Sequence, residues 1–376
     1  MLVTIEALRL KGGSFPEMKY HFILRPFLRT AGRDTACKAE FAGHIAGLSI
    51  PLHLRCHMTK TVKTFKYQFS DLLVTGFFDL CVIILRGLPL RGLILISKIM
   101  GSLTFYSMKK YRERVIGNLS IAFGREKDLK EIKKLAKEVF FHFTLTPLET
   151  VYAVANGLPL DRFILKIRIE GREHLDAALA QGKGVIALGA HFGSFTLLGT
   201  RLAVEGYPFN LVVNIGHFQK LWGRLAFYQG IVGQKLFSLK PATASIKKSL
   251  NCLRRNEILY IVADEQQRRG GLPVPFFGQI AYTPPGPAIF SLKTGAPILP
   301  MFVLREDEYK RTLVIGNRVE IERTSDEKKD IETLTAKFTK AIEEMVRQYP
   351  NQWAWLNRRW KLPREASLPG GGASRQ

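Results

Sequence analysis

A short apolar run followed by a histidine constrains the fold of this chain more than any other stretch. Residues 185–190, Val-Ile-Ala-Leu-Gly-Ala, follow a Gly-Lys-Gly turn and have the pattern of a strand buried on both faces. His191 stands where this strand should end, and apolar residues then recur at helical spacing from Thr196 to Val204. A strand, a tight turn and a helix in this order expose a side chain at the carboxyl edge of an α/β sheet.

The same alternation continues through most of the chain. The predicted strands are 164–169, 185–190, 209–214, 235–238, 257–262, 297–304 and 311–316. The predicted helices are 173–181, 196–205, 217–230, 242–255, 286–293 and 331–348. This alternation predicts an α/β fold, with a mixed, mostly parallel sheet and helices on both faces. An earlier helix should begin at Asp128, with Glu131 at capping-box spacing, and end near Pro147.

The most hydrophobic part of the chain lies ahead of this alternation, at residues 72–106. Two runs, 72–85 and 92–106, contain only Asp79 and Lys98 as charged residues, and each is shorter than the ~20 residues of a membrane span. A basic run from Lys109 to Arg114 follows directly. The pattern predicts an interfacial anchor or a broken single span on an anionic membrane surface, and a buried core hairpin is the alternative.

The overall charge indicates the class of partner, and the cysteine spacing indicates whether metal or disulfide sites are expected. The formal net charge is +24, which implies an anionic partner such as nucleic acid, an acidic membrane or a phosphorylated substrate. The 46% hydrophobic content and the lack of a nucleic-acid motif favour membrane lipid and predict no nucleic acid. The four cysteines lie far apart without a Cys-x-x-Cys pair, so we expect reduced thiols, no zinc site and no disulfide framework.

His191 is the first candidate for chemistry, because an imidazole titrates near neutral pH and can act as a general base. An inert, hydrogen-bonded core histidine is the alternative. Asp264 ends the predicted strand 257–262 and therefore belongs to the same carboxyl edge as His191. The backbone N–H groups around Gly193 and the following helix start are expected to stabilise an oxyanion.

Several motifs together resemble a known family. They are His191–Ser194, Asp264–Gln267, Pro275–Gly278, Ala281–Pro287, Thr294–Pro297 and Tyr349–Lys361. Their order over roughly residues 70–362 is similar to that of the lipid A biosynthesis lauroyl/myristoyl acyltransferase family, within the lysophospholipid acyltransferase-like superfamily. One position departs from the family pattern. The histidine is normally followed, after four intervening residues, by an acid, and this chain has Thr196 there.

The resemblance implies a glycerolipid-acyltransferase-like mixed sheet with an N-terminal membrane-associating helical segment. It further implies transfer of a fatty acyl chain from acyl carrier protein or acyl-CoA to a hydroxyl of a phosphorylated glycolipid such as a lipid A precursor. No metal or bound cofactor is implied. The expected location is the bacterial inner membrane, with the catalytic domain on its cytoplasmic face.

The domain boundaries follow from the same resemblance. Residues 58–112 should be the membrane-associating segment and residues 113–362 the acyltransferase domain, followed by a disordered tail at 363–376. Residues 1–57 match nothing later in the chain, and Met58 opens a basic lead into the apolar runs. We expect residues 1–57 to be a non-native or disordered extension from an upstream start site.

The resemblance also implies the site residues. His191 is the expected base, and Thr196 and Asp264 are the candidates to support it. Substrate contacts are expected from Phe192, Gly193, Ser194, Arg224, Phe276, Phe277, Gly278 and Thr283. Arg224 corresponds to an arginine near the acceptor phosphate, with solvated surface as the alternative. The Phe276–Gly278 stretch corresponds to an acceptor-pocket loop, with core aromatics as the alternative. Thr283 should also cap the helix that follows it.

The Thr196 departure leaves three possibilities. A threonine supplies no charge to stabilise an imidazolium, and loss of a triad-type acid can cost about 10⁴ in turnover. Either another carboxylate substitutes, with Asp264 best placed by topology, or the enzyme is slow, or the protein only binds lipid. Acylation of another lipid acceptor remains an alternative within enzymes. The tryptophans at 353, 355 and 360 are predicted to pack in the structure or to contact the membrane.

Overall fold

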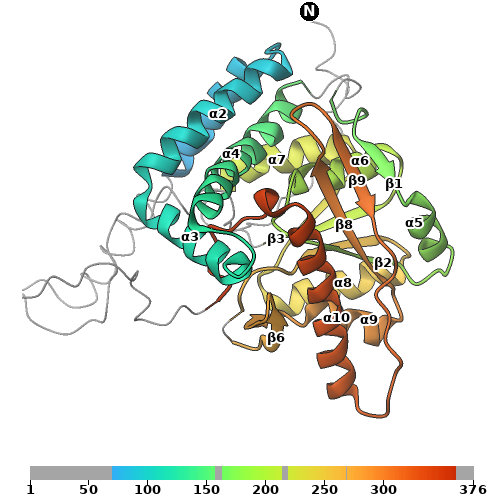
Figure 1. Cartoon of the computed structure of the whole chain (residues 1–376). Coiled ribbons are helices and arrows are strands. Elements are labelled where there is room, and N and C mark those ends of the chain that lie inside the picture. Colours follow the sequence, from blue (N-terminus) through green and yellow to red (C-terminus); the bar gives the residue numbers. More distant parts are fainter. Residues whose placement is uncertain (1–69, 157–162, 214–218, 268, 361–376) are drawn as a thin grey trace, which may run out of the picture.

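A seven-stranded sheet forms the centre of the molecule, in the order β1-β9-β8-β2-β5-β3-β4 (Figure 1). The computed structural model describes residues 70–156, 163–213, 219–267 and 269–360, so the predictions for residues 1–57 and 363–376 lie outside the described residues. The strands are β1 (Arg168–Glu170), β2 (Val185–Gly189), β3 (Phe209–Val213), β4 (Lys235–Ser238), β5 (Ile258–Val262), β8 (Ile298–Arg305) and β9 (Arg311–Ile315). Only β8 and β9 pair antiparallel in this sheet, which confirms the mixed, mostly parallel arrangement.

Strand β2 lies at the middle of the sheet because every one of its residues is apolar and buried. It pairs in parallel with β5 on one side and with β8 on the other. Its alternate side chains enter two cores, with Ile186 and Leu188 in one and Val185 and Ala187 in the other. His191 follows two residues after the strand, at the carboxyl edge that β2 shares with its parallel neighbours.

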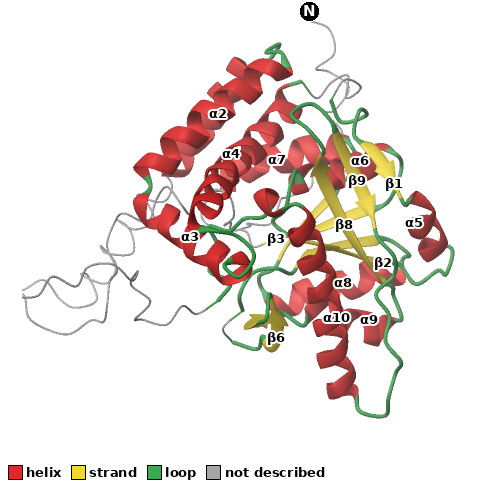
Figure 2. Ribbon diagram, in the orientation of Figure 1, coloured by secondary structure: helices red, strands yellow, loops and turns green. Residues whose placement is uncertain are grey.

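Helices cover both faces of this sheet, as predicted (Figure 2). On one side are α8 (Ala242–Arg254), α9 (Gly286–Thr294) and α10 (Glu327–Gln348), whose buried residues join the core of Ile186 and Leu188. On the other side α5 (Arg172–Leu179) and α6 (Leu198–Val204) join the core of Val185 and Ala187. A short 3₁₀ helix, η2 (Phe195–Leu197), leads from the turn after β2 into α6.

A second, two-stranded sheet of β6 (Leu272–Phe276) and β7 (Gln279–Thr283) was not predicted. Pro273 and Pro275 in β6 argue against a strand, but an isolated antiparallel ribbon has an open edge that tolerates residues without an N–H. The expected cap at Thr283 is wrong. Thr283 ends β7 and is buried, and Pro284 and Pro285 delay the start of α9 to Gly286, with Pro285 at the N-cap position.

The helix expected from Asp128 is α4 (Leu129–Ala155), and its start is confirmed. Asp128 accepts from the Glu131 backbone N–H, and the Glu131 side chain accepts from the Asp128 N–H. The predicted end at Pro147 is wrong, because the helix continues through the proline for two further turns. A proline removes one helical hydrogen bond, but buried Leu145 and Glu149 on either side of it hold α4 against the core.

Helices also form the hydrophobic stretch ahead of α4. Residues 70–85 are helical and are followed by α2 (Leu90–Ser107) and α3 (Lys109–Phe123). Gly101 lets α2 approach α4 closely, since a Cβ there would lie 2.8 Å from the Cα of Phe141. The outer sides of these helices expose large apolar residues, among them Phe77, Ile83, Leu95 and Leu103. Within the described ranges, no helix is both long enough and apolar enough to cross a membrane.

Candidate active site

His191 emerges from β2 into a closely packed setting. Its side chain is only 7% exposed, and its ring meets the Phe195 ring edge to face with centroids 5.1 Å apart. Its backbone carbonyl accepts a hydrogen bond from the Ala354 N–H at 2.9 Å. The ring contact with Phe195 and the backbone hydrogen bond from Ala354 therefore fix the position of His191.

Asp264 lies against His191 through both carboxylate oxygens. Oδ1 is 2.8 Å from His191 Nδ1, and Oδ2 accepts from the His191 backbone N–H at 2.9 Å. The indole Nε1 of Trp353 donates to the same Oδ2 at 2.7 Å. This contact arises because β2 and β5 are parallel neighbours, and each releases its polar residue two positions after its last strand residue.

The pair is buried, and the two groups shift each other's pKa in opposite directions. Burial alone would lower the pKa of His191, but the charge of Asp264 and the hydrogen bond to it together raise that pKa above its ordinary value. Burial would raise the pKa of Asp264, but His191 and the hydrogen bonds it receives hold that pKa low. An ionised Asp264 therefore favours the imidazolium that forms when His191 takes up a proton.

The turn after His191 uses its backbone donors within the protein. The Gly193 N–H donates to the Gln352 carbonyl and the Ser194 N–H to the Val303 carbonyl, both at 2.9 Å. The N–H groups of Gly193 and Ser194 are therefore already used within the protein, and the oxyanion role expected for the start of the following helix stays a prediction. Gly193 has φ +54°, and a Cβ there would lie 2.1 Å from the Val303 carbonyl oxygen, so only glycine allows the turn to lie this close to β8.

A second buried ionic cluster, which the sequence did not predict, lies next to this turn. Glu149 of α4 accepts from Ser194 Oγ at 2.7 Å, from Arg305 Nη2 at 2.6 Å and from Arg311 Nη2 at 2.7 Å. All four side chains are buried. Burial favours protonated Glu149, but the two guanidinium groups outweigh it and lower its pKa to about 2. The sequence signal for this cluster was Glu149, which is the one acidic residue in the second half of α4.

Two residues with predicted substrate contacts, Ser194 and Phe192, lie next to this ionic cluster. The hydroxyl of Ser194 is engaged with Glu149 and is buried, and Phe192 is fully buried beside Phe302. Thr146 of α4 completes the contact by donating to the Gly193 carbonyl at 3.0 Å. The structure thus shows the Phe192–Ser194 segment as the support of His191, and the substrate contacts predicted for it remain predictions.

Thr196, where the resemblance leads one to expect an acid, is hydrogen-bonded to α4. It lies in η2, and its hydroxyl accepts from Thr150 Oγ1 of α4 at 2.7 Å. Asp264 reaches His191 from the neighbouring strand instead. A carboxylate thus faces Nδ1 even though Thr196 supplies none.

With this geometry in view, comparison with known proteins identifies the family. The model of the family described as bacterial lipid A biosynthesis acyltransferase matches residues 62–362. The chain belongs to this family. The match takes in the helices at 70–123 together with the sheet and the His191–Asp264 pair.

Individual relatives of this lipid A acyltransferase family member are distant. The chain is 25% identical to the lipid A biosynthesis lauroyltransferase of Escherichia coli, over 70% of this chain and 83% of that protein. It is 24% identical to the palmitoleoyltransferase of the same organism, over 73% and 86%. It is 27% identical to the phosphatidylinositol mannoside acyltransferase of Mycobacterium tuberculosis, over 51% and 59%. The chain thus spans less than two thirds of the mycobacterial relative that it matches.

Arg224, assigned by family resemblance to an acceptor phosphate, lies on α7 (Gln219–Ile231). Its guanidinium contacts Asp79 at 3.1 Å, and its side chain is 58% exposed. Its predicted phosphate role therefore remains a prediction.

The family's aromatic motifs form a packed cluster beneath the pair. Phe276 is fully buried against Trp353 and Trp360, and Phe277 packs against Trp355. Trp353, Trp355 and Trp360 are at most 5% exposed, which agrees with the prediction that they pack in the structure. Phe277 and Gly278 form the β6–β7 turn with φ of +51° and +70°. The family resemblance implies that this turn is part of an acceptor pocket, whereas in this structure the Phe277 ring packs into the aromatic cluster.

Arg359 of the same motif is a further residue that the sequence did not single out. It is buried over the Phe276 ring, 4.7 Å from the centroid, and donates to Thr283 Oγ1 at 2.7 Å. Thr283, predicted to contact substrate, is thus fully buried and accepts a hydrogen bond from Arg359 in this structure. The predicted substrate contacts of Phe276, Phe277, Gly278 and Thr283 stay untested predictions.

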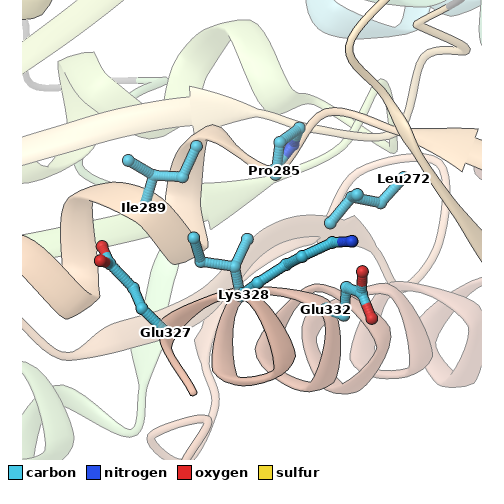
Figure 3. A pocket seen from close by; sticks show the side chains of 7 residues that line it. Leu272, Pro285, Ile289, Glu327, Lys328 and Glu332 are labelled. Carbon is cyan, nitrogen blue, oxygen red and sulfur yellow. The ribbon is translucent and has the colours of Figure 1, made fainter. Parts of the chain in front are cut away.

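A surface groove of about 410 Å³ has a different set of lining residues (Figure 3). Leu272, Pro285, Ile289 and Ile331 supply its apolar floor, and charged residues of the first turns of α10 stand at its rim. Neither His191 nor Asp264 lines it. Among the described residues, no group of three or more His, Cys, Asp or Glu side chains is placed to hold a metal ion.

Proposed function

We propose that this protein transfers a fatty acyl chain from a thioester donor, acyl carrier protein or acyl-CoA, to a hydroxyl of a phosphorylated glycolipid. A lipid A precursor is the acceptor that family membership and the Escherichia coli relatives favour. The observation that carries the proposal is the 2.8 Å contact between His191 Nδ1 and Asp264 Oδ1 at the carboxyl edge of two parallel strands.

His191 acts as the general base. With the Nδ1 proton held by Asp264, the lone pair that can accept a proton is on Nε2. The acceptor hydroxyl gives its proton to Nε2 as its oxygen attacks the thioester carbonyl, and a C–O bond forms. The imidazolium carries the new positive charge beside Asp264, whose carboxylate is fixed by the Trp353 indole and the His191 backbone.

The tetrahedral intermediate then releases the donor thiol. The C–S bond breaks, the sulfur leaves with the electron pair, and the imidazolium returns the proton to it. His191 is thereby restored as a neutral base, and the products are an ester and a free thiol. Asp264 remains ionised throughout, in the orienting role that carboxylates have in triads.

We also propose that the protein works at the cytoplasmic face of a bacterial inner membrane. The exposed apolar residues of helix 70–85 and of α2, with Lys109 and Lys110 beginning α3, support an anionic membrane surface as the contact. Binding of helix 70–85 and α2 to the membrane would bring the active site to the surface that contains the lipid acceptor.

Lipid mass spectrometry of a deletion strain tests the function directly. We expect a phosphorylated glycolipid to lose the mass of one acyl chain, and wild-type protein to restore it. His191→Ala should not restore it, whereas His174→Ala should, because His174 bonds only the Ile315 carbonyl outside the site. An unchanged lipid profile on deletion would exclude this acceptor class. Restoration by His191→Ala would instead contradict the assignment of His191 as the base.

A further inference from the structure

Arg359 is a buried cation that forms no ion pair with the described residues. Its side chain is 1% exposed. Its guanidinium lies over the Phe276 ring, donates to Thr283 Oγ1 at 2.7 Å and lies 3.4 Å from the Glu265 carbonyl oxygen. Nε has no hydrogen-bond partner in the parts of the chain that the structure describes. A charge is costly to bury without compensation, so packing alone does not favour an arginine here.

This lack of a carboxylate partner distinguishes Arg359 from the other buried arginines. Elsewhere in the described chain, buried arginines are held by carboxylates, in the pairs Arg201–Glu205, Arg305–Glu149 and Arg311–Glu149. Because one partner of a buried ion pair is strongly destabilising without the other, such pairing is the usual condition for burial of a charge. The charge that compensates Arg359 must therefore act without direct contact.

Asp264 is the carboxylate whose charge reaches Arg359. Burial lowers the pKa of Arg359 to about 10, and the negative charge of Asp264 acts in the opposite direction. Asp264 directly precedes Glu265, whose carbonyl oxygen faces the guanidinium. Trp353, which donates to Asp264 Oδ2, packs on the same Phe276 ring as Arg359. Since the attraction between two charges is mutual, Arg359 stabilises ionised Asp264 by as much as Asp264 stabilises charged Arg359.

The position of this cation matters because the His191–Asp264 pair changes its net charge during the proposed reaction. The pair is negative when His191 is neutral, and it has no net charge once His191 has taken up a proton. A nearby cation stabilises the negative state more than the uncharged state. Burial lowers the pKa of His191, but Asp264 raises it above its ordinary value, which favours the protonated form. Arg359 opposes this effect of Asp264.

Neutral and anionic groups around the pair cannot supply the same effect. On β5, burial raises the pKa of Tyr260, so its hydroxyl stays neutral, and the exposed Glu265 favours a protonated pair. On α10, Glu343 is paired with Lys340 and Arg347, each at 3.1 Å. These groups are either uncharged, of the wrong sign or already compensated.

Other cations near the turn at residues 191–194 are engaged elsewhere. In the cluster of α4, β8 and β9, the charges that act on Arg305 are those of Glu149 and the second arginine of that cluster. His142 is neutral there, because burial and the charge of Arg305 lower its pKa to about 3. On α3, the partly exposed Arg114 donates to the Leu356 carbonyl at 3.0 Å. Their contacts therefore lie with groups other than the pair.

We propose that Arg359 is a positioning residue whose buried charge keeps Asp264 ionised and His191 unprotonated, and so available as the base, an inference that rests on the proposed function. Arg359 touches neither the substrate nor the imidazole in this role. It acts through Asp264 across the aromatic layer that Phe276 and Trp353 form.

The test measures the pKa of His191 by NMR in the full chain with labelled histidine imidazoles, and His191→Ala identifies the signals. Arg359→Met removes the charge and keeps a side chain of similar length over Phe276. We expect the pKa of His191 to rise by about 0.5–1 pH unit in this variant, because the negative pair loses its cation. The acid limb of kcat/KM for acyl transfer should move to higher pH by the same amount.

Two further variants separate charge from packing. Arg359→Lys keeps the charge, so the pKa of His191 should stay close to that of wild type. Arg347→Met is the matched control, because Arg347 also lies over a ring of the aromatic cluster, 4.6 Å from the Phe277 centroid, but is paired with Glu343. It should leave the pKa of His191 unchanged. If Arg359→Met does not fold, Arg359→Met/Asp264→Asn, which lacks both charges, should fold.

Four results would overturn the inference. They are an unchanged pKa of His191 in Arg359→Met, an equal rise in Arg359→Lys, an equal rise in Arg347→Met, and failure of both Arg359→Met and the double variant to fold. A rise in the pKa of His191 as expected, in a protein that transfers no acyl chain, would refute the proposed function while the effect of Arg359 on the pair stands.

Discussion

Two buried ionic clusters flank the turn at residues 191–194, and they differ in whether they can change charge. In the first, His191 contacts Asp264, and an imidazole exchanges a proton near neutral pH. In the second, Glu149 contacts the guanidinium groups of Arg305 and Arg311. Glu149, with a pKa of about 2, stays ionised.

This difference assigns a catalytic role to the His191–Asp264 cluster and a structural role to the Glu149 cluster. Both clusters are buried and both are hydrogen-bonded to the same turn, so burial and charge alone do not identify a catalytic group. The second cluster also holds an imidazole, since His142 Nδ1 lies 3.3 Å from Arg305 Nη1, but burial and the charge of Arg305 lower the pKa of His142 to about 3. In the first cluster Asp264 instead raises the pKa of His191, which suits a group that accepts a proton from a substrate and returns it. The second joins α4, β8 and β9 to Ser194, and thereby keeps the turn in the geometry that presents His191. Substitutions should therefore affect activity at the first cluster and stability at the second.

The largest effect is expected from His191→Ala. Removal of the base should lower transfer by about 10³–10⁴-fold while the free energy of unfolding changes far less. Steady-state transfer, together with urea denaturation of the same preparation, measures both quantities. A variant that transfers at the wild-type rate would contradict the base assignment.

Glu149→Gln should show the opposite profile. The substitution leaves two buried guanidinium groups facing a neutral amide, and loss of one partner of a buried ion pair costs about 3–5 kcal/mol of stability. Urea denaturation should detect this loss. Because the pKa of Glu149 is lowered from 4.5 to about 2, its stabilisation is present above pH 4.5 and is lost as the pH falls toward 2. The variant should therefore lose this part of the acid dependence, and retention of it would assign that dependence to other carboxylates.

Thr196→Glu should have the smallest effect. It restores the family's acid at this position, but Asp264 already occupies the Nδ1 side of His191, so turnover should change little. The substitution removes the hydrogen bond between Thr150 and Thr196, which is worth about 1 kcal/mol of stability. Thr150→Val is the matched control, since it removes the same bond without adding charge. A large gain in turnover would mean that Asp264 does not support the native base.

Much of the first cluster could be predicted from sequence, whereas the second could not. His191 and Asp264 each follow an apolar strand, and parallel neighbours place such residues at one edge. This order along the chain made Asp264 the preferred carboxylate beside His191, and the structure shows the contact, although its catalytic role is still to be measured. Strands and helices of the sheet were predictable for the same reason, since periodic apolar patterns mark them.

The second cluster depends on how α4 is turned against β8 and β9. Arg305 and Glu149 are 156 positions apart, so their contact follows from tertiary packing that no local pattern records. The prediction that α4 ends at Pro147 placed Glu149 outside the helix and hid the cluster further. The contact of Trp353 with Asp264 and the proline-containing β6–β7 ribbon were missed for the same reason, because tertiary contacts outweigh local signals there.

The pH dependence of acyl transfer in wild type and in Asp264→Asn tests the central claim most directly. Below the pKa of His191 the imidazole is protonated and cannot act as a base, so kcat/KM falls on the acid side. Asp264 raises that pKa above 6.5, while burial alone lowers it. We predict that Asp264→Asn lowers kcat/KM by about 10²–10⁴-fold and moves the acid limb to lower pH. An acid limb at the wild-type position, with kcat/KM unimpaired, would show that Asp264 is not the partner of the catalytic base.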